Sequence, residues 1–527
     1  MFFRKICCDF TQNNVIKTRN IRFYRNLASN LKDNVNRDVI LQAFESVQIN
    51  SVKDWTNVRK AILEHELNRG QYSNNTIDAM ILGHCVKTRQ FDLGASYITF
   101  LNQEKIKPNL ATVGKYLRLI YLKNQDSCLE SGKPCKVSEE KLIFKHYEDL
   151  RKDYPVLDSI SLENITCALS LTTRWRQCLD LLKEIKVSVV PSSTAYSTVI
   201  ASCFSRNEES LGWELLREML EYERVPQSVA YLAYIKSVAK IRKKTEALEK
   251  LEQLFLFLQE NNLKCDEDVG AYICQTARKL GYRSDFTIVT HRGLCRSCSR
   301  TLNNFDLTDE DFNELRTKVF EKVIVGRDVF VKTSPEELER FKNFAASMGQ
   351  FDVVLDGLNI AYSAGTKQQP FVYSSLVALV VSHFVQKRKK VLVLGRAHMN
   401  RWPKKNWGYV TQNASVFLAQ DISQDDPYLL YCALNSGKDT VIVTRDLMRS
   451  HKFLLRDPRL KMLFDRWLSQ RQWHLLRVDE RKGPIFRIPP PFSIVAQCND
   501  GTWHIPYETD APKDKNEFHS TWLCLKK

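Results

Sequence analysis

The chain has 527 residues, and its 78 lysine and arginine residues against 61 aspartate and glutamate residues give a formal net charge of +17. This length exceeds what one hydrophobic core supports, so two or three domains are expected. The positive charge favours a polyanionic partner, and no apolar run approaches the roughly 20 residues that span a bilayer, which leaves nucleic acid as the favoured partner.

The first predicted element is an N-terminal presequence over residues 1–35. Its first 30 residues hold six lysine and arginine residues and one acid, Asp9, among large apolar side chains. A basic, acid-poor, amphipathic N-terminus is typical of a mitochondrial presequence and predicts the mitochondrial matrix as the location. The alternative is a basic arm that contacts RNA directly.

Residues 36–285 are expected to be helical almost throughout and to contain an internal repeat. The segment Val190–Tyr196 recurs as Val225–Tyr231, an offset of 35 residues, and earlier helix starts have similar spacing. Each start leads into two amphipathic helices, such as 196–204 followed by 209–222. Because so short a pair cannot bury its own apolar side, neighbouring pairs are expected to stack into an all-α solenoid.

These units resemble pentatricopeptide repeats, with about five recognisable between residues 74 and 285. The resemblance rests on the period, on the Pro-x-x-x-x-Tyr helix entry and on Leu215-Leu-x-Glu-Met219 in a second helix. In that family the concave face binds single-stranded or looped RNA. A tetratricopeptide-like scaffold that binds proteins has the same geometry, and the basic charge of the chain favours RNA.

The segment after the repeats is predicted to form a helical connector and then an α/β domain. Helix starts at Thr308 and at Ser334-Pro335 indicate a helical connector over residues 306–350. This connector is either an ordinary packing region between domains or a mobile element that blocks metal binding. Over residues 351–491, short apolar strands alternate with helices, which predicts a parallel sheet covered on both faces. The expected strands are 351–356, 391–394, 416–418 and 440–444, and the expected helices are 372–386, 427–435 and 460–468.

Four carboxylates lie where these strands end. Asp356 and Asp446 follow strands, and Asp425 and Asp426 begin a helix. Ligands of such sheets bind outside the carboxyl ends of the strands, so the four are expected to converge. Gathered carboxylates repel one another unless a hard cation lies between them, and Mg²⁺ acting on a phosphodiester is the usual combination. Taken singly, Asp356 could form a turn and Asp426 could cap its helix.

Three motifs around these acids resemble the NYN-type metallonuclease domain of protein-only ribonuclease P: Asp356-Gly-Leu-Asn-Ile-Ala361, Gln424-Asp-Asp426 and Thr444-Arg-Asp-Leu-Met-Arg-Ser-His451. The order of segments resembles the animal mitochondrial members of that family. The resemblance implies two Mg²⁺ ions, with Mn²⁺ as a possible substitute, held by Asp356, Asp425, Asp426 and Asp446. One ion would lower the pKa of the attacking water, and the other would stabilise the leaving 3′-oxygen.

The reaction that the resemblance implies is removal of the 5′ leader from mitochondrial precursor tRNAs. Hydrolysis would leave a 5′-phosphate on the mature tRNA and a 3′-hydroxyl on the leader. Asn359 is expected beside Asp356 as a hydrogen-bonding neighbour, and His451 is expected to face solvent or a phosphate. A tRNA methyltransferase subunit and a short-chain dehydrogenase subunit are the protein partners implied.

A second metal site is indicated by Cys295-Arg-Ser-Cys298, which follows the last repeat. The 15 cysteines otherwise lack regular spacing, so reduced thiols are expected rather than a secreted disulfide framework. Zinc needs four tetrahedral ligands, and the C-terminal tail offers candidates, among which Cys498 and His519 are rivals that spacing does not exclude. The family resemblance implies a structural Zn²⁺ in a split module of residues 286–305 and 492–527, held by Cys295, Cys298, His504 and Cys524.

Two other functions stay open on the sequence. One is a nuclease that acts on other mitochondrial transcripts. The other is a non-catalytic RNA-binding protein in which the α/β domain is a scaffold. The intact set of four acids argues against the scaffold, because a scaffold has no need for carboxylates that repel one another.

Overall fold

The computed structural model describes residues 39–47, 49, 51–65, 73–319, 335–420, 426–446, 448, 455, 457–479, 482–509 and 519–527. The chain divides into two compact units, Met1–Leu216 and Arg217–Lys527. The predicted presequence lies outside the described residues. Across the described ranges, no helix combines the length and the apolar character needed to cross a membrane.

Antiparallel helix pairs build the first unit and the start of the second. The first pair consists of α2 (Val39–Ser46) and α3 (Trp55–Leu63). Five further pairs follow within the fully described range from Ile77 to Glu260. These five are α4 (Ile77–Thr88) and α5 (Phe91–Gln103), α6 (Leu110–Ser131) and α7 (Val137–Asp153), α8 (Ser159–Ser170) and α9 (Gln177–Lys186), α10 (Ser193–Ser205) and α11 (Glu209–Glu221), and α12 (Ser228–Val238) and α13 (Lys244–Glu260).

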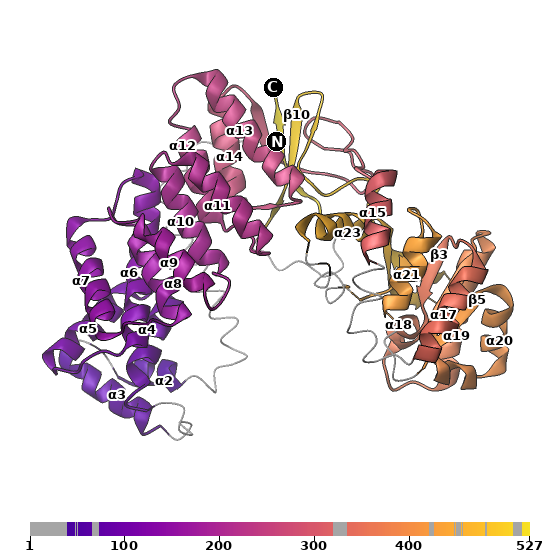
Figure 1. Cartoon of the computed structure of the whole chain (residues 1–527), viewed down its shortest axis with the longest axis horizontal. Helices are drawn as coiled ribbons and strands as arrows, with labels where there is room; N and C mark the ends of the chain where they lie inside the picture. The colour runs from indigo at the N-terminus through magenta and orange to yellow at the C-terminus, as the bar shows by residue number, and fades with distance from the viewer. Residues whose placement is uncertain are drawn as a thin grey trace, which may run out of the picture. The chain divides into compact units, whose positions relative to one another are not determined.

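The first helices of successive pairs pack on one another, α4 on α6, α6 on α8 and α8 on α10, as expected for a solenoid (Figure 1). Equivalent caps mark their starts. The side chains of Asn109, Asp158 and Ser192 each accept a hydrogen bond from the backbone N–H three residues later, at 2.9, 2.9 and 3.2 Å. Each such cap stabilises its helix by about 1 kcal/mol. The predicted pentatricopeptide-like helical solenoid is therefore confirmed.

A small mixed sheet follows the last helix pair. Its strands are β1 (Cys265–Asp266), β2 (Arg283–Ile288), β9 (Gln497–Asn499), β10 (Thr502–Glu508) and β11 (Thr521–Lys526), in the order β1-β10-β11-β2 with β9 beside β10. Helix α14 (Glu267–Lys279) packs on β2, β10 and β11. Strand β1 and the first residues of β2 lie before the predicted boundary at residue 286, so the C-terminal strands pair partly with a segment that we had expected to belong to the repeats.

The α/β domain contains a six-stranded sheet in the order β5-β4-β3-β6-β7-β8. The strands are β3 (Val353–Asp356), β4 (Val391–Arg396), β5 (Ser415–Ala419), β6 (Val441–Val443), β7 (Gln472–Asp479) and β8 (Gly483–Arg487). The pairings from β5 to β7 are parallel, and β8 pairs antiparallel with β7. The predicted parallel sheet is therefore confirmed with its four predicted strands, β3 to β6, whereas the parallel strand β7 and its antiparallel neighbour β8 were not predicted.

Helices cover both faces of this sheet. One face packs against α15 (Asp309–Val319), α17 (Pro335–Met348), α21 (Asp426–Ser436) and α23 (Pro458–Arg471), and the other against α18 (Gly357–Ala361), α19 (Pro370–Gln386) and α20 (Lys404–Asn413). Alternate residues of β3 divide between the two cores, since Val354 belongs to the first core and Leu355 to the second. Burial on both faces explains why these strands read as continuous apolar runs.

The connector contributes α15 and α17 and is fixed to the sheet edge where it is described. Arg340 in α17 donates a hydrogen bond to the backbone oxygen of Leu418 in β5, at 2.7 Å. Glu337 accepts one from the backbone N–H of Gln420, at 3.1 Å. Helix α17 thus occupies hydrogen-bonding groups of an edge strand that would otherwise be open to pairing.

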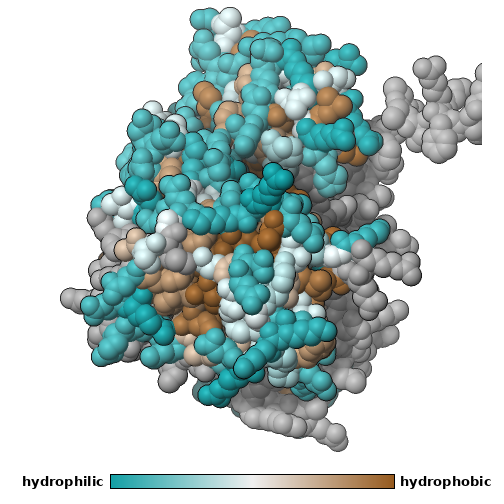
Figure 2. Space-filling model, turned by 90° about the vertical axis from the view of Figure 1, so that its right-hand side faces the viewer, coloured by the Kyte–Doolittle hydropathy of each residue, from teal (hydrophilic) through white to brown (hydrophobic). Residues whose placement is uncertain are grey.

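Figure 2, the view from the right-hand side of Figure 1, shows mainly hydrophilic side chains with hydrophobic ones gathered in several places between them. Large apolar side chains exposed in the α/β domain include Phe371 and Leu379 of α19, which are 52% and 43% exposed.

Candidate functional site

The first candidate site lies at the carboxyl end of β3, where Asp356 closes the strand. Its side chain is 9% exposed and caps α18 by accepting a hydrogen bond from the backbone N–H of Asn359 at 2.9 Å. Gly357, the residue that follows Asp356, lies against the neighbouring strand β4. A Cβ atom at this position would lie 2.8 Å from the backbone oxygen of Leu394 in the neighbouring strand. Glycine is needed for this close approach of two backbones.

Thr444 joins the end of β6 to the end of β3. Its hydroxyl donates a hydrogen bond to Asp356 Oδ2 at 2.8 Å and accepts one from the backbone N–H of Asp446 at 3.1 Å. The side chain of Asn359 makes a parallel connection, because its Oδ1 accepts a hydrogen bond from the backbone N–H of Arg445 at 3.0 Å. The structure therefore brings the strand ends that carry Asp356 and Asp446 together.

Asp446 sits in a short loop that a buried glutamine holds in place. Gln472, at the start of β7, donates through Nε2 to the backbone oxygens of Thr444 and Asp446, at 3.1 and 2.6 Å. The Asp446 carboxylate accepts a hydrogen bond from the backbone N–H of Met448 at 2.9 Å, and the residue is exposed. Asp446 is thus accessible while its backbone is held in place.

The remaining acids of the predicted set are not fully described. Asp425 lies outside the described residues, as does His451, and Asp426 begins α21 without a described side chain. The placement of Asp426 at a helix N-terminus agrees with the preference of that position for negative charge. The four-acid set therefore stays a prediction for these two positions.

The sequence did not single out Thr444 and Gln472 as functional residues. Thr444 stood inside the quoted motif, but its role depends on the register of β6 against β3. Gln472 gave no local signal, because its function depends on β7 pairing with β6, where Ile442 lies opposite Gln472.

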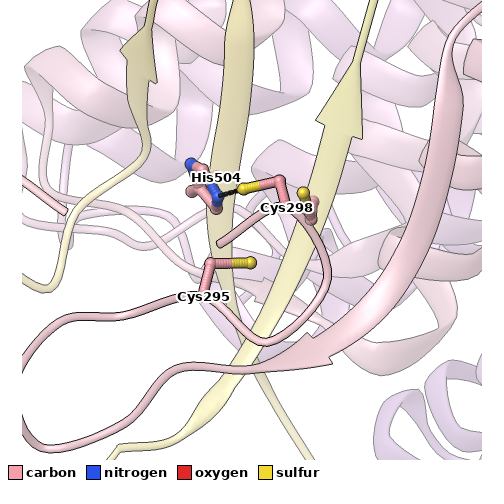
Figure 3. Close-up of side chains that lie close together, drawn as sticks. Cys295, Cys298 and His504 are labelled. Carbon is pink, nitrogen blue, oxygen red and sulfur yellow. Dashed lines mark hydrogen bonds between the residues drawn. The ribbon is translucent and has the colours of Figure 1, made fainter. Parts of the chain in front are cut away.

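The second candidate site is the predicted cysteine and histidine cluster. Cys295, Cys298, His504 and Cys524 each offer one ligand atom, and these atoms lie within 4.8 Å of one another. Figure 3 shows how the side chains of Cys295, Cys298 and His504 lie close together. Zinc–sulfur bonds of about 2.3 Å at tetrahedral angles place sulfur ligands roughly 3.8 Å apart, so the donor set and its spacing fit a closed structural zinc site. Of the rivals, Cys498 is exposed on β9, and neither it nor His519 belongs to the cluster.

Strand pairing positions these ligands. His504 in β10 lies directly opposite Cys524 in β11, and both side chains are buried. The two remaining cysteines come from the turn after β2, in which the backbone N–H of Ser299 donates to the Cys295 oxygen at 3.0 Å. Ser299 adopts a φ of 60°, in the left-handed region. The turn folds the two thiols back onto the strand pair.

The electrostatics of the cluster reflect thiols in close contact. Hydrogen bonding between the thiols of Cys295 and Cys524 lowers the pKa of Cys295 and raises the pKa of Cys524. His504 also contributes to the lowered pKa of Cys295. Cys298 Sγ and His504 Nε2 are 3.2 Å apart. Such a cluster holds one thiolate readily and would release further protons on binding a cation.

Comparison with known proteins places the chain in a family. Residues 289–524 match the model of the family described as protein-only RNase P. The mitochondrial ribonuclease P catalytic subunits of Mus musculus and Rattus norvegicus are each 32% identical over 395 residues, which is 73% of this chain and 66% of each relative. The chain thus spans just under two thirds of the length of these relatives. Proteinaceous RNase P 1, chloroplastic/mitochondrial, of Arabidopsis thaliana is 28% identical over 248 residues, 46% of this chain and 41% of that protein.

The fold comparison agrees with the sequence comparison. The crystal structure of nuclear proteinaceous RNase P 2 from A. thaliana superimposes with a TM-score of 0.56 at 17% identity, over 86% of this chain and 100% of that chain. At this identity the likeness concerns the fold alone. The sequence matches place residues 289–524 of the chain in the protein-only RNase P family, and the fold agrees with that placement.

Proposed function

We propose that this chain is an endoribonuclease that removes the 5′ leader from mitochondrial precursor tRNAs. The observation that carries the proposal is the Asp356–Thr444–Asp446 hydrogen-bond connection at the carboxyl edge of the sheet, inside the region that matches the family. The mouse and rat relatives are named as catalytic subunits of mitochondrial ribonuclease P, which supports both the reaction and the compartment. The predicted presequence supports the mitochondrial matrix.

The residues at this edge suit Mg²⁺ or Mn²⁺. Carboxylate oxygens are the ligands that these hard cations prefer, and Asp356, Asp425, Asp426 and Asp446 would hold two of them. When bound, such ions activate a water for attack and stabilise the negative charge on the leaving oxygen. Thr444 and the backbone of Asn359 each donate a hydrogen bond to Asp356. These bonds fix the orientation of the carboxylate, as neighbours of metal ligands do.

The proposed chemistry is hydrolysis of one phosphodiester bond. The oxygen of water forms a bond to the scissile phosphorus, and the bond from phosphorus to the 3′-oxygen of the leader breaks. The leader leaves with a 3′-hydroxyl, and the phosphate stays on the 5′ end of the tRNA. Asp446, which is exposed, and Asp356, which is 9% exposed, lie where a backbone phosphate can reach the edge of the sheet.

The other parts of the chain would select which phosphate is cut. The helical repeats and the net charge of +17 favour an RNA partner, and we assign the tRNA body to the repeats. The small sheet joins α14 to the C-terminal strands, and a Zn²⁺ held by Cys295, Cys298, His504 and Cys524 would make that junction rigid. Its role would be geometric, because four protein ligands leave no open position for catalysis. A tRNA methyltransferase and a short-chain dehydrogenase remain the proposed protein partners.

An assay that maps cleavage ends tests the proposal. The full chain, alone and with the two partner proteins, is incubated with a precursor tRNA that carries a 5′ leader and, in parallel, with a mitochondrial transcript that lacks tRNA. We expect Mg²⁺-dependent cleavage at the mature 5′ end only. Cleavage of the second transcript with the tRNA precursor left intact would favour the other nuclease function, and no cleavage of either under any combination would overturn an enzymatic role.

A further inference from the structure

A row of polar side chains crosses the carboxyl edge of the α/β sheet from β3 to β8. Val354 pairs with Ile442, and Thr444 beyond it contacts Asp356. Val443 pairs with Trp473, which places His474 beside Thr444. His474 in turn lies directly opposite Arg487 in β8. Since neighbouring strands are about 4.8 Å apart, His474 lies roughly 10 Å and Arg487 roughly 14 Å from Asp356 along this row.

The side chains of this row share one face of the sheet. Gln472 reaches the backbone oxygens of Thr444 and Asp446, and His474 follows Gln472 by two residues, so it points to the same side. Trp473 and Leu475, the alternate residues, pack in the core on the opposite face with α19. The direction of His474 toward the Asp446 loop therefore follows from the strand itself.

Positive charge gathers around His474 in this row. Burial and, to a smaller extent, the guanidinium groups of Arg487 and Arg445 together lower the pKa of His474 to about 4, so both arginines lie within electrostatic reach of the imidazole. Arg445 is exposed and forms no ion pair with any residue that the structure describes, and Arg487 is partly exposed. The edge thus carries acidic side chains at the end of β3 and after β6, and basic groups on Arg445, which follows β6, and on Arg487 in β8.

We propose that Arg445, His474 and Arg487 form an anion subsite that holds a backbone phosphate of the RNA strand close to the scissile phosphate. The inference rests on the proposed function, because it takes the Asp356–Asp446 end as the site of cleavage. Guanidinium groups bind phosphate oxygens through paired N–H donors, and the imidazole adds a further donor. A strand crossing the edge would place one phosphate over the carboxylates and a flanking phosphate over the basic groups.

The basic groups offset the electrostatic repulsion between the exposed carboxylates and the RNA backbone. An RNA backbone is repelled by exposed carboxylates, so a nearby basic group is needed to bring the strand to them. A flanking phosphate fixed by the basic groups would also fix the register of the strand over Asp356 and Asp446. Arg445, His474 and Arg487 are therefore positioning residues for the substrate.

Salt dependence of RNA binding gives the first test. The affinity of the full chain for precursor tRNA is measured by fluorescence anisotropy over a range of salt concentrations, with Ca²⁺ in place of Mg²⁺ and the RNA checked for intactness. Each phosphate contact on a single strand contributes about 0.7 to the slope of log K against log salt. We expect R487Q to reduce the slope by about that amount and R487K to keep it. H474Q should weaken binding with a smaller change in slope.

The matched control is Arg388, an exposed arginine that precedes β4 at the opposite end of the strands. R388Q should leave the slope unchanged. An unchanged slope in R487Q, or an equal reduction in R388Q, would overturn the subsite. A lower melting temperature of R487Q with an unchanged slope would assign Arg487 to stability alone and would also overturn it.

A chemically altered substrate locates the contact. Precursor tRNAs are prepared with a single uncharged methylphosphonate at each of the phosphates flanking the scissile one. One such position should weaken binding to the wild-type chain but not to R487Q, so that the two changes are not additive. Additive losses at every position would contradict a contact next to the cleavage site. Because these readouts are binding, a chain that binds in this way but never cleaves would overturn the proposed function and leave the subsite intact.

Discussion

The hydroxyl of Thr444 donates a hydrogen bond to Asp356 Oδ2 at 2.8 Å, and this bond connects the ends of two neighbouring strands. The hydroxyl oxygen of Thr444 also accepts a hydrogen bond from the backbone N–H of Asp446 at 3.1 Å. The side chain of Thr444 thus orients both the carboxylate of Asp356 and the backbone of Asp446. Its removal should affect cation binding without changing the charge of the site.

We predict that Thr444→Val, which keeps the shape of the side chain and removes the hydroxyl, weakens both Mn²⁺ binding and cleavage. Neighbours of metal ligands typically contribute about 10- to 100-fold to affinity or activity. Mn²⁺ binding is measured by electron paramagnetic resonance, and cleavage in single-turnover reactions. Thr444→Ser, which keeps the hydroxyl, should stay within a few-fold of wild type. Equal losses in both variants would show that the hydroxyl is not the cause.

Gln472 should act on the same loop from the other side. Gln472→Leu removes the two donors to the backbone oxygens of Thr444 and Asp446, and it leaves both oxygens without this partner in a buried setting. We expect a higher Mg²⁺ concentration for half-maximal cleavage while the affinity for precursor tRNA is unchanged. A loss of tRNA affinity with an unchanged Mg²⁺ requirement would contradict this role.

The cysteine and histidine cluster yields a prediction that is independent of activity. Cys524→Ser removes a buried ligand opposite His504, so elemental analysis should find about one zinc fewer per chain than in wild type, together with a lower melting temperature. Cys498→Ser, which alters an exposed cysteine on the adjoining β9, should retain the metal. Equal zinc contents in the two variants would contradict the assigned ligand set.

Loss of the zinc should also change where the RNA is cut. The site has no open position for catalysis, and the sheet joins α14 to the C-terminal strands. We therefore expect folded Cys524→Ser protein to cleave precursor tRNA at positions displaced from the mature 5′ end before it loses chemistry. Sequencing of the products checks this. Unchanged accuracy in a zinc-free, folded variant would exclude a role in positioning.

His146 gives the helical repeats a predicted sensitivity to acid. Burial lowers the pKa of this histidine, which packs edge-on against Tyr116 with ring centroids 5.5 Å apart. Above a pH of about 6.5 the side chain is neutral in both the folded and the unfolded chain, so it adds no pH dependence there. Below that pH the unfolded chain binds the proton more readily, so the stability of the repeat falls.

Hydrogen exchange of amides in α6 and α7 at pH 7 and pH 5 measures this effect. The loss of protection on going to pH 5 should be smaller in His146→Phe, which has no proton to bind. His291→Gln, a change at an exposed histidine, should behave like wild type. An equal loss of protection in His146→Phe would mean that other groups cause the acid sensitivity.

The sequence predicted those parts of the fold whose signals are local. Strand β3 was predicted because Val353–Leu355 is a buried apolar run that ends at an aspartate, and the repeats were predicted from their 35-residue offset. Strands β7 and β8 were missed because Gln472–Asp479 carries no clean alternation and is held as a strand by pairing with β6. Local sequence patterns therefore did not predict the full strand order of the sheet.

The same contrast between local signals and strand pairing applies to the residues of the two candidate sites. The positions of Asp356 and Asp446 followed from strand ends, whereas the roles of Thr444 and Gln472 depend on register between strands. For the metal cluster, Cys298 and His504 are 206 residues apart in the chain, and spacing alone left Cys498 and His519 as rivals. The pairing of His504 with Cys524 across β10 and β11 separates the cluster from both rivals.

The central claim, that the carboxyl edge of the sheet is the site of leader removal, is tested most directly by single-turnover cleavage of a 5′-extended precursor tRNA, with the partner proteins present. Asp446→Asn is compared with Asp352→Asn, a change at the amino end of the strand that carries Asp356. The account predicts that Asp446→Asn lowers the rate by more than about 100-fold while tRNA affinity is kept, and that Asp352→Asn cleaves at the mature 5′ end like wild type. Wild-type cleavage by Asp446→Asn would contradict it.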